Sequence, residues 1–486
     1  MDNPPPIQAA PPAVHTADDG YRKALSNRQI QMIAMGGAIG VGLFLGAGSR
    51  LQAMGPSLIL AYLLCGTVAF FVMRALGELV MYRPSSGSFA SYAREFIGPE
   101  AGFVSGWMFW FNWGVGGVAE LTAIGIYVHK WLPDLAQWVT ALIALAILLA
   151  VNLLSVKAFG EFEFWFAIVK VAAIVCFLGV GIWLVATGAQ IGGGTAGLGN
   201  LFHGDSVWTS FFPAGFAIAL LSLQSVIMAY NGIEMVGIAA GETAQPRKVI
   251  PRAVNSVALR IILFYCGSVL LLVMIMPWTA YGATESPFVL VFSELGVPAA
   301  GHIMNIVVIT AALSSTNSGL YSTGRILRSM AERQQAPRIL SYMSRRGIPA
   351  GGIIFTAVAA LPGVALSYVV PHQAFDIILA LAGLGALCTW TTILASHLGM
   401  LRQRRRNGEQ REAFRMPFAP YSNYIAIAFL LMVVISLGLA PDLAARVALC
   451  AIPPIALVLF LGWRSVRGRV TTQEVFIATE DRTPGL

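Results

Sequence analysis

The sequence predicts an all-α polytopic membrane protein with twelve transmembrane helices. Of its 486 residues, 57% are hydrophobic and only 11% are charged, whereas about 25% of the residues in an ordinary soluble domain are charged. Apolar runs of about twenty residues, long enough to cross a hydrocarbon core about 30 Å thick, recur along nearly the whole chain. This pattern excludes a soluble enzyme, a disordered chain and a nucleic-acid-binding protein, although the isoelectric point is near 9.4.

The ends of each of the twelve predicted spans are defined to within a few residues. The spans cover residues 29–50, 57–80, 101–127, 138–156, 163–187, 211–238, 254–277, 299–326, 351–371, 374–401, 423–440 and 445–464.

The distribution of Lys and Arg predicts the orientation of these spans. With the N-terminus in the cytoplasm, all but four of the 31 Lys and Arg fall in cytoplasmic segments. The exceptions are Arg50, Lys130 and Arg446 on the outer side and Lys170 inside a span. The positive-inside rule therefore places both termini in the cytoplasm. The basic run 402–406 is then a solvated cytoplasmic face rather than a site for nucleic acid.

Neither a targeting segment nor a metal site is predicted. Residues 1–28 are rich in proline and lack the pattern of a signal peptide, so we expect a disordered cytoplasmic tail. The five cysteines are scattered over the predicted spans and form no CxxC pair. We therefore expect no disulfide, no metal site and no cofactor.

The first span contains an unusual density of glycine. Six of the thirteen residues from Gly36 to Gly48 are glycine, and such a stretch either packs closely against other helices or unwinds over a polar cavity. A helix interrupted in mid-membrane presents free N–H groups and a positive dipole end, which suit a carboxylate. Unwound carbonyls nearby can hold an ammonium group, so such a site would fit an α-amino acid.

A second interrupted helix is predicted five spans later. Tyr230, Asn231 and Gly232 lie in the middle of the sixth span and are followed by the intramembrane Glu234. Interrupted helices at corresponding positions in two halves are typical of transporters built from inverted repeats. The interval between the two interruptions is the one that a 5+5 inverted repeat requires.

Further ionisable residues lie within spans, where a charge is costly and usually functional. Arg74 and Glu78 are four residues apart on one helical face, which favours a structural or gating ion pair. Glu120 could form a polar contact between helices, or it could bind the substrate or a proton. Glu234 could act in coupling or gating.

Lys170 has two interpretations. It could extend its ammonium to the inner interface, or be a buried amine that exchanges a proton during a cycle or permanently fills a cation site. Ser314 and Ser315, with Thr316 and Asn317, could either ligate such an ammonium or form hydrogen bonds between helices.

Several segments together resemble the amino acid–polyamine–organocation superfamily, specifically its bacterial amino acid permeases. The resemblance covers about 22–466. Its motifs are residues 36–44, 74–79, 83–89, 159–166 and 234–237, with further likeness at 286–289, 304–308 and 312–330.

The resemblance implies a 5+5 inverted repeat with two additional helices. The expected parts are a transporter core at 29–401 made of repeats 29–187 and 211–401, a basic cytoplasmic loop at 402–422, helices 11 and 12 at 423–464, and a cytoplasmic tail at 465–486.

The resemblance also implies proton-coupled uptake of a neutral amino acid across a bacterial inner membrane, with protons and the bilayer as the other partners and the oligomeric state open. The segments at 286–289, 304–308 and 312–330 make L-asparagine the first candidate substrate. D-serine, D-alanine and glycine, or aromatic amino acids, are alternatives. A channel, an amino-acid-sensing receptor and a membrane-embedded enzyme are other classes, but no HExxH motif supports the last.

The resemblance assigns roles to individual residues. It implies that the substrate binds at Ile39, Gly40, Val41 and Gly42 through its carboxylate, and at Met228, Tyr230 and Gly232 through its amine; we add Glu120 as a further binding residue. Proton coupling or gating is expected at Lys170, Glu234, Ser314 and Ser315. Lys170 matches a lysine that replaces a sodium ion of related sodium-coupled transporters. The sequence departs from the family pattern at Val41, Met228 and Asn231, where family members commonly have other residue types.

Overall fold

The protein is helical, as the sequence predicts. The computed structural model describes residues 28–29, 32, 39–85, 87–202, 205–239, 246–282, 285–369, 371–411 and 413–480. Within these residues, seven helices are long and apolar enough to cross a membrane, and an eighth is added if one bent pair forms a single span. The strands described are β1 (Gln190–Ile191) and β2 (Gly194–Thr195), an antiparallel pair in which Gln190 lies opposite Thr195. A polytopic helical membrane protein is thereby confirmed.

The main helices lie close to the predicted spans, although several extend beyond them; two of them, joined by the π-helical residues 261–267, form a single span from 247 to 275. They are α4 (Ser57–Tyr82), α6 (Pro99–His129), α7 (Gln137–Leu154), α8 (Val156–Thr187), α13 (Pro246–Arg260), α14 (Ser268–Ile275), α16 (Pro298–Glu332), α17 (Ala350–Val369), α18 (Pro371–Arg406), α19 (Tyr421–Ser436) and α20 (Leu443–Glu480). The predicted basic loop therefore begins inside α18, and the predicted C-terminal tail is helical as far as Glu480.

Short helices connect or interrupt these spans. They are α2 (Val41–Phe44), α3 (Gly46–Met54), α5 (Ser88–Phe96), η1 (Leu198–Leu201), α9 (Val207–Phe211), α10 (Phe216–Leu221), α11 (Leu223–Ile227), η2 (Met228–Tyr230), α12 (Met235–Ala239), the π-helix η4 (Ile261–Gly267), η5 (Trp278–Ala280), α15 (Pro287–Glu294) and η6 (Arg338–Ser341).

Helix α8 starts earlier than predicted. Ser155 ends α7 and caps α8, because its side-chain oxygen accepts a 2.9 Å hydrogen bond from the backbone N–H of Ala158. The helix therefore begins seven residues before the predicted span. Lys170 is the fifteenth residue of a 32-residue helix, about 21 Å from its start, and it is fully buried. The alternative in which its ammonium reaches the inner interface is excluded in this conformation.

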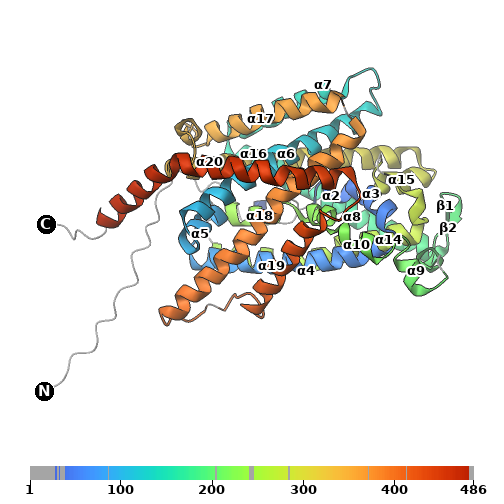
Figure 1. Cartoon of the computed structure of the whole chain (residues 1–486). Coiled ribbons are helices and arrows are strands. Elements are labelled where there is room, and N and C mark those ends of the chain that lie inside the picture. The colour runs from blue at the N-terminus through green and yellow to red at the C-terminus, as the bar shows by residue number, and fades with distance from the viewer. Residues whose placement is uncertain are drawn as a thin grey trace.

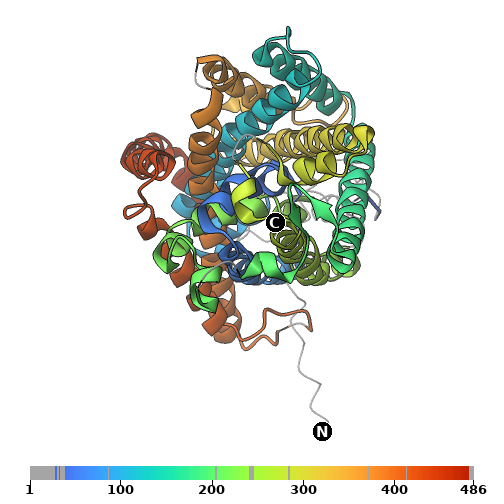
Figure 2. The same cartoon turned by 90° about the vertical axis from the view of Figure 1, so that its right-hand side faces the viewer.

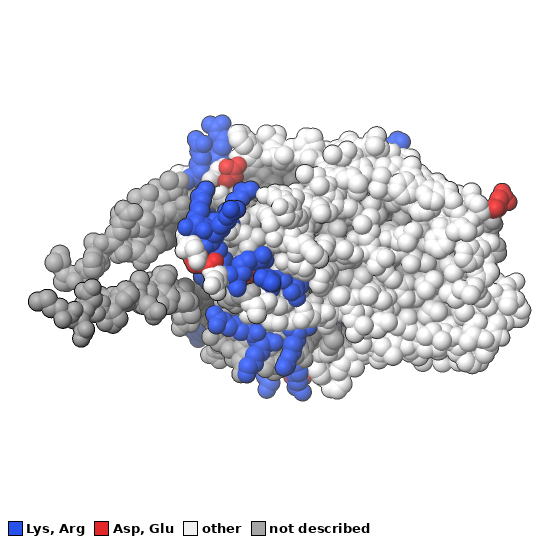
Figure 3. Space-filling model, turned by 90° about the horizontal axis from the view of Figure 1, so that it is seen from below, with Lys and Arg blue, Asp and Glu red and all other residues white. Residues whose placement is uncertain are grey.

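The arrangement places the short helices α2 and α3 in the middle of the molecule. Helix α6 packs against α16 and α18, and α16 packs against α8. The view along the helices in Figure 2 shows α2 and α3 near the centre, within the longer helices, and α20 at the periphery. Figure 1 shows α6, α16 and α20 running along the long axis of the molecule. On the face shown in Figure 3, Lys and Arg gather at one end.

The predicted pair of Arg74 and Glu78 was wrong. Arg74 donates to the Asn255 side chain and to the Arg415 carbonyl, each at 2.6 Å. Glu78 instead accepts two hydrogen bonds from Arg411, at 2.9 and 2.8 Å, and forms a third with His397 at 2.9 Å. Helical spacing brought Arg74 and Glu78 to one face, but the loop after α18 supplied a better partner for the carboxylate.

Candidate functional site

The first span is interrupted where glycine predicts it. Ile39 and Gly40 are not helical, and Gly40 is extended with φ −122° and ψ −165°. Helix α2 starts at Val41, and only Leu45 separates it from α3. The Gly40 carbonyl accepts from the N–H of Leu43 at 3.1 Å, and a helix that starts at Val41 presents its first N–H groups without partners inside that helix. Gly36 and Gly37, which belong to the same prediction, lie outside the described residues.

The sixth span is interrupted as well. The chain passes from α11 into the 3₁₀ turn η2, becomes extended at Asn231, and resumes as α12 at Met235. Gly232 has φ +97°, a left-handed conformation that favours glycine. The span also contains a bend that the sequence did not predict, because Val207–Leu221 and Leu223–Ile238 meet at 83°.

The two interruptions touch each other. A Cβ atom on Gly42 would lie 2.8 Å from the Met228 carbonyl oxygen and 3.2 Å from Cα of Ala229, so a larger residue would push the two segments apart. Arg50 of α3 donates a hydrogen bond to the Gly42 carbonyl and another, at 3.1 Å, to the Tyr62 hydroxyl. Arg50 therefore ties the first interruption to α4.

A small cavity lies between the interruptions and helices α6, α16 and α18. Its volume is about 20 Å³, which is room for one water molecule. A free amino acid is larger, so its entry requires the walls to separate. The lining residues are Gly40, Gly42, Trp113, Gly116, Glu120, Met228, Ala229, Asn231, Ser315 and Leu379.

Glu120 is the carboxylate of this cavity. Its Oε1 accepts a 2.8 Å hydrogen bond from the Ser315 hydroxyl, and it also accepts from the backbone N–H of Val41. Its Oε2 is buried without a hydrogen-bond partner among the described residues. A carboxylate of the protein itself thus occupies the start of α2, where the sequence predicts the carboxylate of a substrate.

Lys170 lies behind this cavity in a buried network. Its Nζ donates to the Ser314 hydroxyl at 2.8 Å, and that hydroxyl donates to Oε1 of Glu163 at 2.6 Å. Glu163 is fully buried and lies seven residues before Lys170 on α8. The ammonium also attracts Glu120 electrostatically. Sequence reasoning missed Glu163 because the predicted span began at this residue, although its spacing of two helical turns from Lys170 was a usable signal.

Two amide side chains meet at the edge of the cavity. Asn112 of α6 donates from Nδ2 to Oδ1 of Asn231 at 2.8 Å. Asn231 lines the cavity, whereas Asn112 is buried behind it. An amide offers both a donor and an acceptor, so this pair can bind another amide.

Several predicted site residues do not line the cavity. Tyr230 donates to the Tyr62 carbonyl at 2.7 Å and stacks on Tyr265 with centroids 4.4 Å apart, so its side chain points into α4 and η4. Glu234 is fully buried, and Trp390 donates to it at 3.4 Å. The predicted residues outside the lining are Ile39, Val41, Tyr230, Gly232, Glu234, Lys170 and Ser314.

A second cavity lies on the other side of Leu379, which lines both. It has a volume of about 350 Å³ and contains Arg50, Asp376 and Asp442 on its wall. Leu379 therefore lies in the wall of both cavities, and Arg50, which donates to the Gly42 carbonyl, lines the larger one. Among the described residues, no group of His, Cys, Asp and Glu could hold a metal ion.

Comparisons with known proteins show the family of this chain. A family model described as amino acid permease matches residues 29–473. An L-asparagine permease of Streptomyces coelicolor is 52% identical over 94% of this chain and 93% of its own length. An L-asparagine permease of Salmonella typhimurium is 50% identical over 93% of this chain and 90% of its own. L-asparagine permease 2 of Mycobacterium bovis is 48% identical over 96% and 95%.

These matches cover nearly the whole chain, including both interruptions and the Lys170 network. The chain therefore belongs to the amino acid permease family and is a membrane transporter rather than an enzyme.

Proposed function

We propose that this protein is a proton-coupled importer of L-asparagine that works by alternating access. Relatives about half identical to it over more than nine-tenths of its length are named L-asparagine permeases. The single observation that carries the mechanism is the cavity enclosed between two interrupted helices and lined by Gly40, Gly42, Met228 and Glu120. Interrupted helices over a buried cavity present backbone groups that a zwitterion requires.

The substrate carboxylate binds the N–H groups at the start of α2, around Gly40, Val41 and Gly42. As the first N–H groups of a helix, they have no partner within α2. The substrate ammonium binds carbonyls around Met228 and Ala229, at the interruption of the sixth span. Both contacts use backbone, so they are the same for every α-amino acid.

Selectivity for asparagine comes from the amide of Asn231, held by Asn112. The substrate carboxamide can donate to one amide oxygen and accept from one amide nitrogen. A site built to pair a polar group rejects analogues that lack it, because its own buried amide would lose a partner. D-serine, D-alanine, glycine and aromatic amino acids are then poorer substrates.

Proton coupling follows from competition at α2. Glu120 accepts from Val41 N–H, which is also a proposed donor to the substrate carboxylate. Two carboxylates in one enclosed cavity repel each other, so binding of the substrate favours a proton on Glu120. Ser315 and Ser314 are neighbours on α16, and each binds one of the two ionisable groups, Glu120 and Lys170. A change in the charge of Glu120 then changes its electrostatic attraction to the ammonium of Lys170.

Alternating access opens the cavity to each side in turn. The central space holds only about one water, so the structure represents a closed form. Glu234 and Trp390, buried below the second interruption, fit a gating role on the inner side. The motion would occur between inverted repeats 29–187 and 211–401 of a twelve-helix fold with two peripheral helices, 423–440 and 445–464.

The proposed location is a bacterial inner membrane, with both termini in the cytoplasm. The concentration of Lys and Arg at one end of the molecule supports this orientation, and the named relatives are bacterial.

The decisive experiment uses proteoliposomes with an inward proton gradient and labelled L-asparagine. We expect accumulation that a protonophore abolishes and that unlabelled L-asparagine inhibits more strongly than D-serine, glycine or phenylalanine. If one of these alternatives inhibits more strongly than L-asparagine, that amino acid and not L-asparagine is the substrate. Accumulation that does not depend on the proton gradient would refute proton coupling. A channel is recognised by current without countertransport of preloaded substrate.

A further inference from the structure

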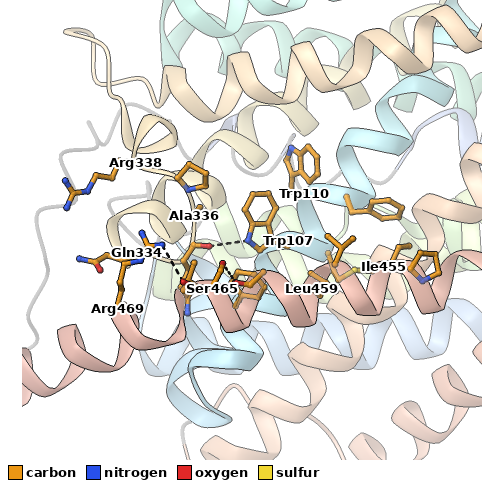
Figure 4. A pocket seen from close by; sticks show the side chains of 18 residues that line it. Trp107, Trp110, Gln334, Ala336, Arg338, Ile455, Leu459, Ser465 and Arg469 are labelled. Atoms are coloured by element: carbon orange, nitrogen blue, oxygen red, sulfur yellow. Dashed lines mark hydrogen bonds between the residues drawn. The ribbon is translucent and has the colours of Figure 1, made fainter.

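A large groove lies on the outside of the helical bundle, away from the central cavity. Its walls are α6, α20 and the segment Gln334–Arg338 that links α16 to η6, and its volume is about 850 Å³. Figure 4 shows Trp107 and Trp110 of α6 above α20, with the linking segment closing one end. Helix α20 is scarcely buried within the protein, so the groove opens toward the surrounding membrane.

The groove changes from polar to apolar along its length. In Figure 4, Arg338, Gln334 and Arg469 lie toward one end, whereas Leu459 and Ile455 lie toward the other. No acidic side chain is among its described lining residues. Within the part of the chain that the structure describes, neither arginine has a carboxylate at ion-pair distance. The polar end is therefore positive, and the described residues give it no counter-charge.

Two buried polar atoms in the groove also lack a partner. The indole Nε1 of Trp110 and the side-chain oxygen of Gln335 have none among the described residues. Gln335 is otherwise fixed, because its side-chain Nε2 donates to the Pro99 carbonyl at 2.9 Å. Its backbone carbonyl accepts from the Trp107 indole at 3.3 Å. Both atoms have almost no accessible surface, so they lie within the wall and do not face the groove.

The length of the groove matches one leaflet of a bilayer. Pro454 and Arg469 mark its extent along α20, a rise of about 22 Å. Half of a bilayer, including its headgroup region, is about 20–22 Å thick. The arginines thus lie at headgroup depth, and Ile455 lies near the centre of the membrane.

We propose that this groove binds an anionic glycerophospholipid of the cytoplasmic leaflet. One acyl chain lies between Trp107 and Leu459, and the phosphate pairs with Arg338 and Arg469. Arginine recognises phosphate oxygens well because its donors form a planar fork. The lipid would join α20 to the inner ends of α6 and α16.

Native mass spectrometry of the purified full chain with added lipids tests this proposal. We expect phosphatidylglycerol to bind more tightly than phosphatidylcholine, by about 30-fold if each arginine contributes as a basic residue at an anionic surface does. The double variant Arg338→Gln/Arg469→Gln should lose this preference. The matched double variant Arg405→Gln/Arg464→Gln removes two exposed arginines outside the groove and should keep it.

A second variant tests the apolar part without changing charge. Val458→Trp fills the groove from α20 and should weaken binding of phosphatidylglycerol and phosphatidylcholine alike. The proposal is overturned if both double variants lose the preference equally, or if glycerol 3-phosphate displaces the lipid at equal concentration. It is also overturned if the delipidated chain forms a dimer that Val458→Trp abolishes, since the groove would then be a contact between two copies.

Discussion

Lys170 and Glu163 are joined through a single hydroxyl, that of Ser314. The ammonium donates to this oxygen at 2.8 Å, and the hydroxyl donates to the carboxylate at 2.6 Å. All three groups are fully buried, so the positive charge of Lys170 and the negative charge of Glu163 compensate each other inside the bundle. Removal of one charge leaves the other uncompensated in a low-dielectric interior.

This relationship predicts different outcomes for single and double variants. Lys170→Met should lower the stability by about 3–5 kcal/mol, because it leaves Glu163 buried without a cation. Lys170→Met/Glu163→Gln should recover most of that loss but should still fail to accumulate substrate with a proton gradient. Thermal unfolding in detergent and uptake by proteoliposomes measure the two effects. Full gradient-driven uptake by the double variant would show that Lys170 takes no part in proton coupling.

Glu120→Gln separates proton coupling from binding. The amide oxygen can still accept from Ser315, but the side chain can no longer exchange a proton. We expect L-asparagine exchange between the two sides to persist, whereas accumulation driven by the gradient should fall at least tenfold. Glu100→Gln, at the exposed start of the same helix, serves as the control. Loss of exchange and accumulation together would indicate that Glu120 is needed for binding or folding instead.

The close contact between the two interruptions makes Gly42 sensitive to size. Gly42→Val should abolish substrate binding while expression persists, because any Cβ at this position meets the Met228 carbonyl at 2.8 Å. Gly114→Ala is the matched control, since its Cβ would find its nearest neighbour, the Trp110 ring, at 3.6 Å. Binding of L-asparagine is measured by scintillation proximity. An unchanged affinity in Gly42→Val would count against carboxylate binding at α2.

Asn231→Ala should reduce selectivity more than it reduces transport. Loss of one hydrogen bond to the substrate carboxamide costs about 1–3 kcal/mol, or roughly 5- to 150-fold in affinity. Inhibition by L-alanine, which has no amide, should change little. Asn152→Ala disrupts the other amide pair, with Asn317 at 2.8 Å, away from the cavity. If Asn231→Ala and Asn152→Ala have the same effect on selectivity, the amide recognition is wrong.

The Glu78 cluster ties the cytoplasmic loop after α18 to α4. Arg411→Gln removes two hydrogen bonds from a nearly inaccessible carboxylate, so it should cost about 3 kcal/mol of stability. Arg405→Gln, on an exposed arginine of the same region, should cost little. Unfolding midpoints of the two purified variants provide the comparison, and equal midpoints would show that His397 and the backbone N–H of Met416 suffice to hold Glu78.

The positions of the helix interruptions could be predicted from local sequence. Glycine at Gly40, Gly42 and Gly232 weakens helicity wherever it stands, so the interruptions appeared where composition placed them. The start of α8 could not be predicted in this way. Ser155 separates two apolar helices without any polar loop, and hydropathy alone does not register a single capping residue.

The amino-acid sequence by itself determined the membrane class, the interrupted helices and the buried position of the ionisable residues. Each depends on the cost of placing a given residue type in hydrocarbon, which is a local property. Tertiary structure alone decided the partners: Glu78 pairs with Arg411 rather than Arg74, Tyr230 points away from the cavity, and Glu163 accompanies Lys170. The hydrogen-bond partner of a side chain depends on its distance from elements that are far apart in the chain. That distance is fixed only when the helices pack.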